Sequence, residues 1–157
     1  MNLKFYVNNA MIATLYVILV YVFAFMSFEA IQFRIAEALL IVFLFNKRTM
    51  PGLLIGTFVA NYLLSTIGLV DAFVGTLATF VVLVFMNYAK SLWIKLVIPG
   101  VINGLIIGLM LSLLFALPFF EMVFWVFLGE TAVMFVVGYP LYVVLKRNPL
   151  FQELINF

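Results

Sequence analysis

Eight polar side chains stand in or beside the long apolar segments of this 157-residue chain, and their types could bind a small molecule. They are Gln32, Arg34, Glu37, Asn61, Tyr62, Asp71, Asn103 and Glu130. Carboxylates and amides make several hydrogen bonds each, and flat aromatic side chains can stack on a planar group. The set therefore suits a planar ligand with several hydrogen-bonding groups, and a buried carboxylate would also attract an ammonium group.

Glu130 is the residue of this set whose charge costs the most free energy to place within a membrane. It lies in the apolar run FWVFLGETAVMF, about ten residues into the last apolar segment and about 15 Å from its start at ~1.5 Å per residue. A charge at the centre of a membrane helix costs about 2.5–3.5 kcal/mol, so such residues usually face a bundle interior or a cavity. Two readings stay open here: a ligand-binding or proton-binding carboxylate, or a hydrogen bond to Asn103 that locks two helices together.

The stretch FEAIQFRIAEALL, residues 28–40, concentrates further polar groups. Arg34 and Glu37 are three residues apart, so on a helix they share a face and can pair. We expect an outer loop that folds into the mouth of a helix bundle and then enters the membrane as a helix. The alternative is an Arg–Glu pair that only anchors the helix end at the lipid headgroups.

The composition argues against several kinds of chemistry. The chain has no histidine and no cysteine, which removes the commonest general base and thiolate metal ligands. It has no GxxxxGK[ST], no GxSxG and no paired carboxylates at metal-ligand spacing. We therefore expect no catalytic residue, no metal and no cofactor in this chain. A net charge of +2 is too small to indicate a nucleic-acid partner.

The elements that must position these side chains are apolar segments. With 68% hydrophobic and 9% charged residues, the chain needs lipid as its solvent. Charges, prolines and turn residues divide it into six segments, at 7–27, 33–46, 51–67, 71–88, 94–117 and 120–145. We predict an all-α integral membrane protein, a compact bundle of six transmembrane helices forming a single domain over residues 1–157. The first segment is expected to be a retained span and not a cleaved signal.

The basic residues give this bundle an orientation. With a cytoplasmic N-terminus, seven of the eight lysines and arginines fall on the inner side, and five of the six acids fall on the outer half. The seven are Lys4, Lys47, Arg48, Lys90, Lys95, Lys146 and Arg147. We predict both termini to be cytoplasmic in a multi-pass protein of the cell membrane.

Small residues repeat every four positions in two of the segments. Gly52, Gly56 and Ala60 form one such face, and Gly100, Gly104 and Gly108 form the other. Faces of this kind let two helix backbones approach closely within a membrane. We expect them to be packing surfaces.

Five motifs in consistent order carry a resemblance to a known family. They are QFRIAEAL (32–39), PGLLIGTFVAN (51–61), GLVDAFVGTLAT (68–79), INGLIIG (102–108) and GETAVMFVVGYPLY (129–142). The chain resembles the queuosine-precursor (QueT-type) S components of energy-coupling factor (ECF) transporters. The resemblance implies a six-helix subunit of a prokaryotic cell membrane that captures queuine or another 7-deazaguanine, such as the aminomethyl precursor preQ1, from outside. It also implies partners: a membrane scaffold subunit and two ATPase subunits, which use the ATP.

S components of this type carry an alanine-xxx-alanine patch on the first helix for docking to the scaffold. The corresponding stretch here, AMIATLYV, contains Ala10, Ala13, Thr14 and Val17, with Thr14 at the position of the second alanine. Three other functions remain open: an S component for another vitamin, a self-sufficient ion-coupled carrier that uses Glu130, and a structural membrane subunit whose polar residues only lock helices.

Overall fold

The computed structural model describes residues 3–27 and 33–156, and every regular element in these ranges is a helix. The elements are α1 (Leu3–Val22), α2 (Ala24–Ser27), η1 (Ile35–Leu44), η2 (Lys47–Thr49), α3 (Met50–Leu64), α4 (Leu69–Tyr88), α5 (Leu92–Phe115), α6 (Phe119–Val133), η3 (Met134–Gly138), α7 (Tyr139–Arg147) and α8 (Pro149–Ile155). The predicted all-helical class is confirmed.

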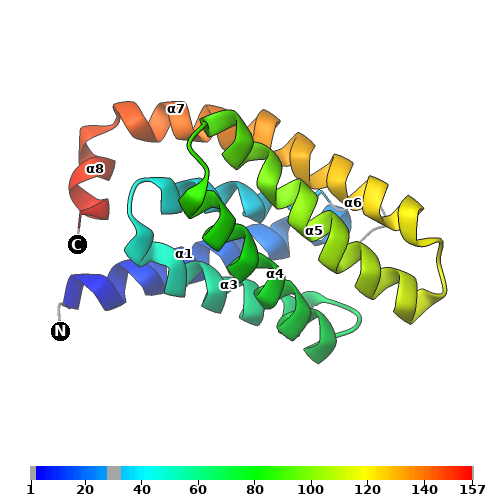
Figure 1. Cartoon of the computed structure of the whole chain (residues 1–157). Helices are drawn as coiled ribbons and strands as arrows, with labels where there is room; N and C mark the ends of the chain where they lie inside the picture. Colours follow the sequence, from blue (N-terminus) through cyan, green and yellow to red (C-terminus); the bar gives the residue numbers. More distant parts are fainter. Residues whose placement is uncertain (1–2, 28–32, 157) are drawn as a thin grey trace.

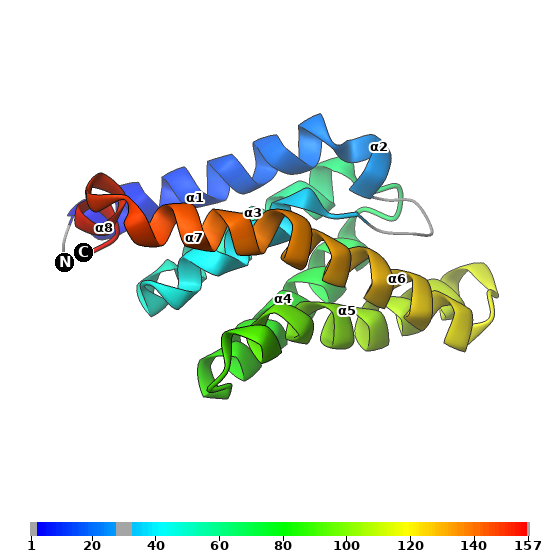
Figure 2. The same cartoon turned by 90° about the horizontal axis from the view of Figure 1, so that it is seen from above.

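Successive long helices pack side by side, and η1 lies among them. Helix α1 packs against α3, α3 against α4, α4 against α5, and α5 against α6. Element η1 contacts α1, α3, α4, α6 and α7, and Figure 2 shows it between α1 and α7. Its residues 36–43 are all buried. The segment that carries Glu37 is therefore the centre of the bundle (Figure 1).

Four helices in the described residues are long and apolar enough to cross a membrane: Leu3–Val22, Leu69–Tyr88, Leu92–Phe115 and the continuous stretch Phe119–Arg147. The outside of the bundle is apolar, with large side chains such as Phe120 and Val136 exposed at 84% and 72%. Lipid can solvate such a surface and water cannot. The chain is thus a membrane-embedded protein.

Three of the six expected segments differ from their predicted form. The last segment, expected as one helix over 120–145, consists of α6, the π-helix η3 and α7. Segment 33–46 forms a 3₁₀ helix of 10 residues instead of an α-helix. Because a 3₁₀ helix rises about 2.0 Å per residue against ~1.5 Å for an α-helix, it covers more depth with the same residues. The first segment, expected as one helix over 7–27, is divided into α1 and the short α2.

Local sequence explains where several helices begin or change. The side chain of Asn46 accepts a hydrogen bond from the backbone N–H of Arg48 at the start of η2. Pro51 stands in the first turn of α3, where its missing N–H does no harm. The π-helix η3 comes just before Pro140, whose ring would crowd a preceding carbonyl in regular α geometry.

The small-residue faces pack as predicted. A Cβ atom at Gly52 would lie 2.6 Å from the backbone oxygen of Asn9, and one at Gly56 would lie 2.8 Å from the Cβ of Tyr16, so this face meets α1. A Cβ at Gly104 would lie 3.1 Å from the backbone oxygen of Val123 on α6. Both glycine faces therefore bring two helix backbones together, which confirms the sequence interpretation.

Both ends of the described chain lie at the same end of the molecule (Figures 1 and 2). Asn8 on α1 donates to the backbone oxygen of Leu154 on α8 at 2.8 Å, and Asn46 donates to that of Ile155 at 2.5 Å. The turns that carry the basic residues, at η2, between α4 and α5 and at the end of α7, lie towards this same end. We call it the basic end.

Candidate functional site

Six of the eight predicted binding residues are buried, with exposed fractions of at most 2%. They come from η1, α3, α4, α5 and α6, and they are Arg34, Glu37, Asn61, Asp71, Asn103 and Glu130. In a chain with few charges, burial of two glutamates, an aspartate and an arginine requires specific partners. We call these six residues the polar cluster.

Asp71 joins three elements of the cluster. Its carboxylate oxygens both lie 3.4 Å from an Nη atom of Arg34, so α4 is paired with the start of η1. Its backbone oxygen accepts a hydrogen bond from the Asn61 amide of α3 at 3.2 Å. The Asn61 amide also fills the space where Gly75 would carry a Cβ, so a glycine is needed there. The expected partner of Arg34 was Glu37; the ion pair is made with Asp71 instead.

Glu37 is bound by a residue that the sequence did not single out. The Tyr16 hydroxyl donates to Glu37 Oε1 at 2.6 Å, and both side chains are fully buried. The other carboxylate oxygen, Oε2, has no hydrogen-bond partner within residues 3–27 and 33–156. One acceptor of Glu37 is thus bound within the fold, and the other is not bound by any described residue.

Glu130 is fully buried within α6. Neither of its carboxylate oxygens, nor the Asn103 amide nitrogen, has a hydrogen-bond partner among the described residues. Asn103 on α5 nevertheless lies close to the Glu130 carboxylate, so the expected alternative, a Glu130–Asn103 bond that locks two helices, stays open. Arg34 and Glu37 lie within electrostatic reach of Glu130, so the carboxylates share one region of the bundle.

Three buried threonine hydroxyl groups lie on α4 and α6, the helices that carry Asp71 and Glu130. The buried hydroxyl oxygens of Thr76, Thr79 and Thr131 have no partner in the part of the chain that the structure describes. Thr131 follows Glu130 but is rotated by about 100° from it around α6 and lies against Gly100 of α5. Thr76 and Thr79 share a face of α4 three residues apart. The three-residue spacing of Thr76 and Thr79 in the sequence could have indicated that they share a helix face.

The polar cluster can bind a group rich in hydrogen-bond donors. Each buried polar atom left unpaired costs about 1–3 kcal/mol, so a ligand that satisfies several of them gains that energy. Carboxylate oxygens of Glu37 and Glu130 accept hydrogen bonds, whereas the Asn103 amide nitrogen donates them. Within the described residues, no three His, Cys, Asp or Glu side chains are grouped so that they could hold a metal ion.

Two predicted residues lie outside this cluster. Gln32 lies outside the described residues. Tyr62 is 50% exposed and stacks on Phe58, with ring centroids 6.5 Å apart, on the outer surface of α3. Since Asn61 takes the inward position, the next residue is rotated by about 100° around the helix. We therefore leave Tyr62 out of the candidate site.

The four expected docking residues divide between two faces of α1. Ala10 and Thr14 are exposed and line an apolar groove of about 690 Å³ formed by α1, η1 and α8. Ala13 faces α3, with its Cα 3.1 Å from the Cβ position of Gly56, and Val17 packs against the hydrophobic core. The groove belongs to the outer surface of α1, and Ala13 belongs to the bundle interior.

An apolar helical exterior around an enclosed cluster of polar side chains defines a membrane protein of the kind that handles polar solutes. The comparison with protein families agrees with this class. The family model described as QueT transporter matches residues 6–147, nearly the whole chain, and the protein belongs to that family. No curated protein and no solved structure matches the chain significantly. A transport role follows from the family.

Proposed function

We propose that this protein is the substrate-binding subunit of an ECF-type importer and captures a queuosine precursor of the 7-deazaguanine class from outside the cell. Membership of the QueT transporter family and the motifs at 32–142 support this proposal. The observation that carries it is the enclosed polar cluster, in which Glu37 and Glu130 have carboxylate oxygens without partners among the described residues.

The chemistry of a deazaguanine matches these atoms. The guanine edge offers adjacent N–H donors that one carboxylate can accept together, and an aminomethyl group would add an ammonium for the second carboxylate. The Asn103 amide nitrogen would donate a hydrogen bond to the ring's carbonyl or to a ring nitrogen acceptor. Arg34, held by Asp71, would keep compensating charge beside the two glutamates.

For orientation, we propose six crossings with the basic end in the cytoplasm of a prokaryotic cell. The four long helices together with η1 and α3 supply six apolar segments, and the described ends of the chain lie together at the basic end. Single cysteines can be introduced into this cysteine-free chain and labelled with an impermeant reagent. A cysteine at Lys90 should stay unlabelled in intact cells while one at Glu121 reacts; labelling at Lys90 would contradict the orientation.

For partners, we propose that the scaffold subunit docks in the α1 groove lined by Ala10 and Thr14. The groove is apolar and is bordered by small side chains, so a helix of the scaffold could approach closely. We expect Thr14→Trp to stop ATP-dependent uptake and leave solute binding by the isolated subunit unchanged. Leu77→Trp, at a residue 57% exposed on α4, is the matched control and should do neither.

The ligand itself is tested on the isolated protein. We expect calorimetry to detect binding of queuine or preQ1, and no binding of thiamine, which lacks a guanine edge. When the protein is purified from its native membrane, we expect two ATPase subunits to co-purify with it. Binding of thiamine but of neither deazaguanine would replace the proposed substrate with another vitamin.

A second function, an ion-coupled carrier, has one observation in its favour. Glu130 is fully buried within an apolar helix, and buried carboxylates within membrane helices often take part in proton relays. Purified protein alone in proteoliposomes distinguishes the two. Uptake driven by a proton gradient without ATPase subunits would favour the carrier, and uptake only with those subunits favours the proposed importer.

A further inference from the structure

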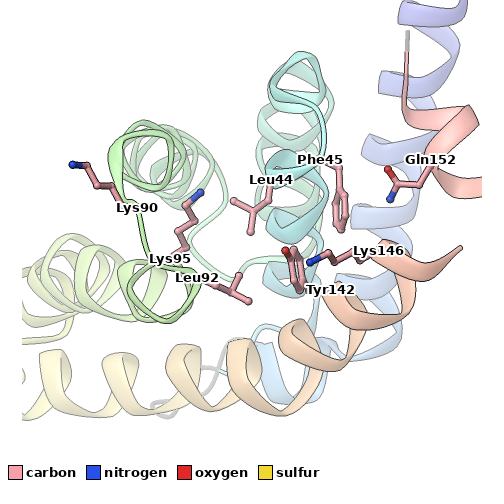
Figure 3. Close-up of a pocket in the computed structure, with 8 residues that line it drawn as sticks. All are labelled: Leu44, Phe45, Lys90, Leu92, Lys95, Tyr142, Lys146 and Gln152. Carbon is pink, nitrogen blue, oxygen red and sulfur yellow. The ribbon is translucent and has the colours of Figure 1, made fainter. Parts of the chain in front are cut away.

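A pocket at the basic end lies apart from the polar cluster. It has a volume of about 410 Å³ and opens between η1, the start of α5, the end of α7 and α8. Figure 3 shows its lining: Leu44, Phe45, Lys90, Leu92, Lys95, Tyr142, Lys146 and Gln152. The polar-cluster residues are absent from this lining, so the pocket is a separate feature.

Two lysines approach the pocket from different helices. Lys95, half-buried on α5, and Lys146, on α7, come from opposite sides, whereas the Lys90 ammonium points away in Figure 3. The Lys146 Nζ lies 5.8 Å from the centre of the Tyr142 ring. The Phe45 ring packs against the same tyrosine at 5.3 Å, which fixes one wall of the pocket. The pocket therefore combines lysine ammonium groups with a lining of aromatic and aliphatic side chains.

The described residues do not balance the charge of this pocket. None of its lining residues is acidic, and none of its lysines forms an ion pair within the described ranges. Like charges brought together repel each other, so an anion between Lys95 and Lys146 would stabilise the arrangement. Lysine ammonium groups with a nearby phenol hydroxyl match a phosphate, which accepts several hydrogen bonds.

We propose that this pocket binds the phosphate group of an anionic phospholipid. Two aromatic residues at the same end, Tyr88 and Trp93, are exposed at 78% and 54%, as expected where helices meet the lipid headgroups. Leu44 and Leu92 would contact the glycerol and first acyl carbons below the phosphate. Basic pockets between membrane helices on the cytoplasmic side suit such headgroups. A free phosphate ester has the same chemistry without the apolar part.

The test is native mass spectrometry of the purified full chain in detergent, titrated with phosphatidylglycerol or phosphatidylcholine. The double variant Lys95→Gln/Lys146→Gln should bind phosphatidylglycerol about thirtyfold more weakly than the parent. Lys4→Gln/Arg147→Gln removes the same charge at the same end outside the pocket lining, and its affinity should match the parent's. Phosphatidylcholine should bind all three proteins equally and weakly.

A second titration separates the two sources of phosphate. Glycerol 3-phosphate should compete only weakly, because it lacks the acyl part. If glycerol 3-phosphate competes as effectively as the lipid, and this competition is lost in Lys95→Gln/Lys146→Gln, the proposed lipid ligand is overturned. The site would then be assigned to a soluble phosphate ester. An equal loss of phosphatidylglycerol affinity in both double variants would show that general surface charge, and not this pocket, binds the lipid, which would contradict the proposal. An unchanged affinity in Lys95→Gln/Lys146→Gln would overturn the site itself.

Discussion

The buried ion pair between Arg34 and Asp71 should stabilise the bundle through a direct interaction of the two charges. The perturbations are Arg34→Met and Asp71→Leu, alone and together. Each single change leaves the opposite charge in a buried site, since only 3% of each of the two side chains is exposed. The double change removes both charges and puts an apolar side chain in place of each charged one.

The expected magnitude follows from the geometry. Breaking a buried ion pair from one side costs about 3–5 kcal/mol. Both N–O distances are 3.4 Å, longer than the ~2.7–2.9 Å of a strong charge-assisted bond, so we expect the lower end, about 3 kcal/mol for each single variant. The double variant should lose much less than the sum, with a coupling free energy of about 2 kcal/mol or more. The Asn61 bond survives, because it uses the backbone of residue 71.

The assay is the free energy of unfolding in mixed micelles, measured by circular dichroism during titration with dodecyl sulfate. Glu121→Gln is the control, because this exposed acid on α6 should change the free energy by less than about 0.5 kcal/mol. If the double variant loses the full sum of the two single losses, the charges do not interact in the folded protein, and the reasoning is refuted.

Two further predictions use the same titration. Tyr16→Phe leaves Glu37 Oε1 without its donor and should cost about 1–3 kcal/mol; Tyr21→Phe, at an exposed tyrosine of the same helix, should cost almost nothing, and equal effects would contradict the bond. Gly52→Ala should destabilise the protein, because the new Cβ would lie 2.6 Å from a backbone oxygen of α1. Gly138→Ala should be tolerated, because its nearest neighbours are 3.5 Å away in ordinary contact, and a large loss there would contradict the packing described.

Much of this architecture could be predicted from the cost of placing charges in lipid. A carboxylate such as Glu130 within an apolar run must face inward, which selects candidate residues without knowledge of the fold. The glycine repeats likewise predict close helix contacts, because a Cβ would prevent them. These arguments depend only on local sequence and on the solvent, so a single sequence is sufficient.

Pairing between distant residues could not be predicted in this way. Spacing placed Arg34 beside Glu37, but the packing of η1 against α4 brings Asp71 to it across 37 residues. Tyr16 was overlooked because a tyrosine in an apolar segment resembles an interfacial or core residue, and only the fold aims its hydroxyl at Glu37. The hydrophobicity of a segment also does not distinguish a 3₁₀ helix from an α-helix, so the 3₁₀ geometry of η1 could not be predicted from the sequence pattern.

The most direct test of the polar cluster as the ligand site is calorimetric binding of queuine and preQ1 to Glu37→Gln, Glu130→Gln and the control Glu121→Gln, with folding checked separately. Removing a carboxylate from a buried charged hydrogen bond leaves the ligand's donors unpaired and costs about 2–5 kcal/mol. We therefore predict affinity roughly 30-fold or more weaker for both cluster variants and unchanged for the control. Folded Glu37→Gln and Glu130→Gln proteins that both bind within about threefold of the parent, less than ~1 kcal/mol, would contradict the account.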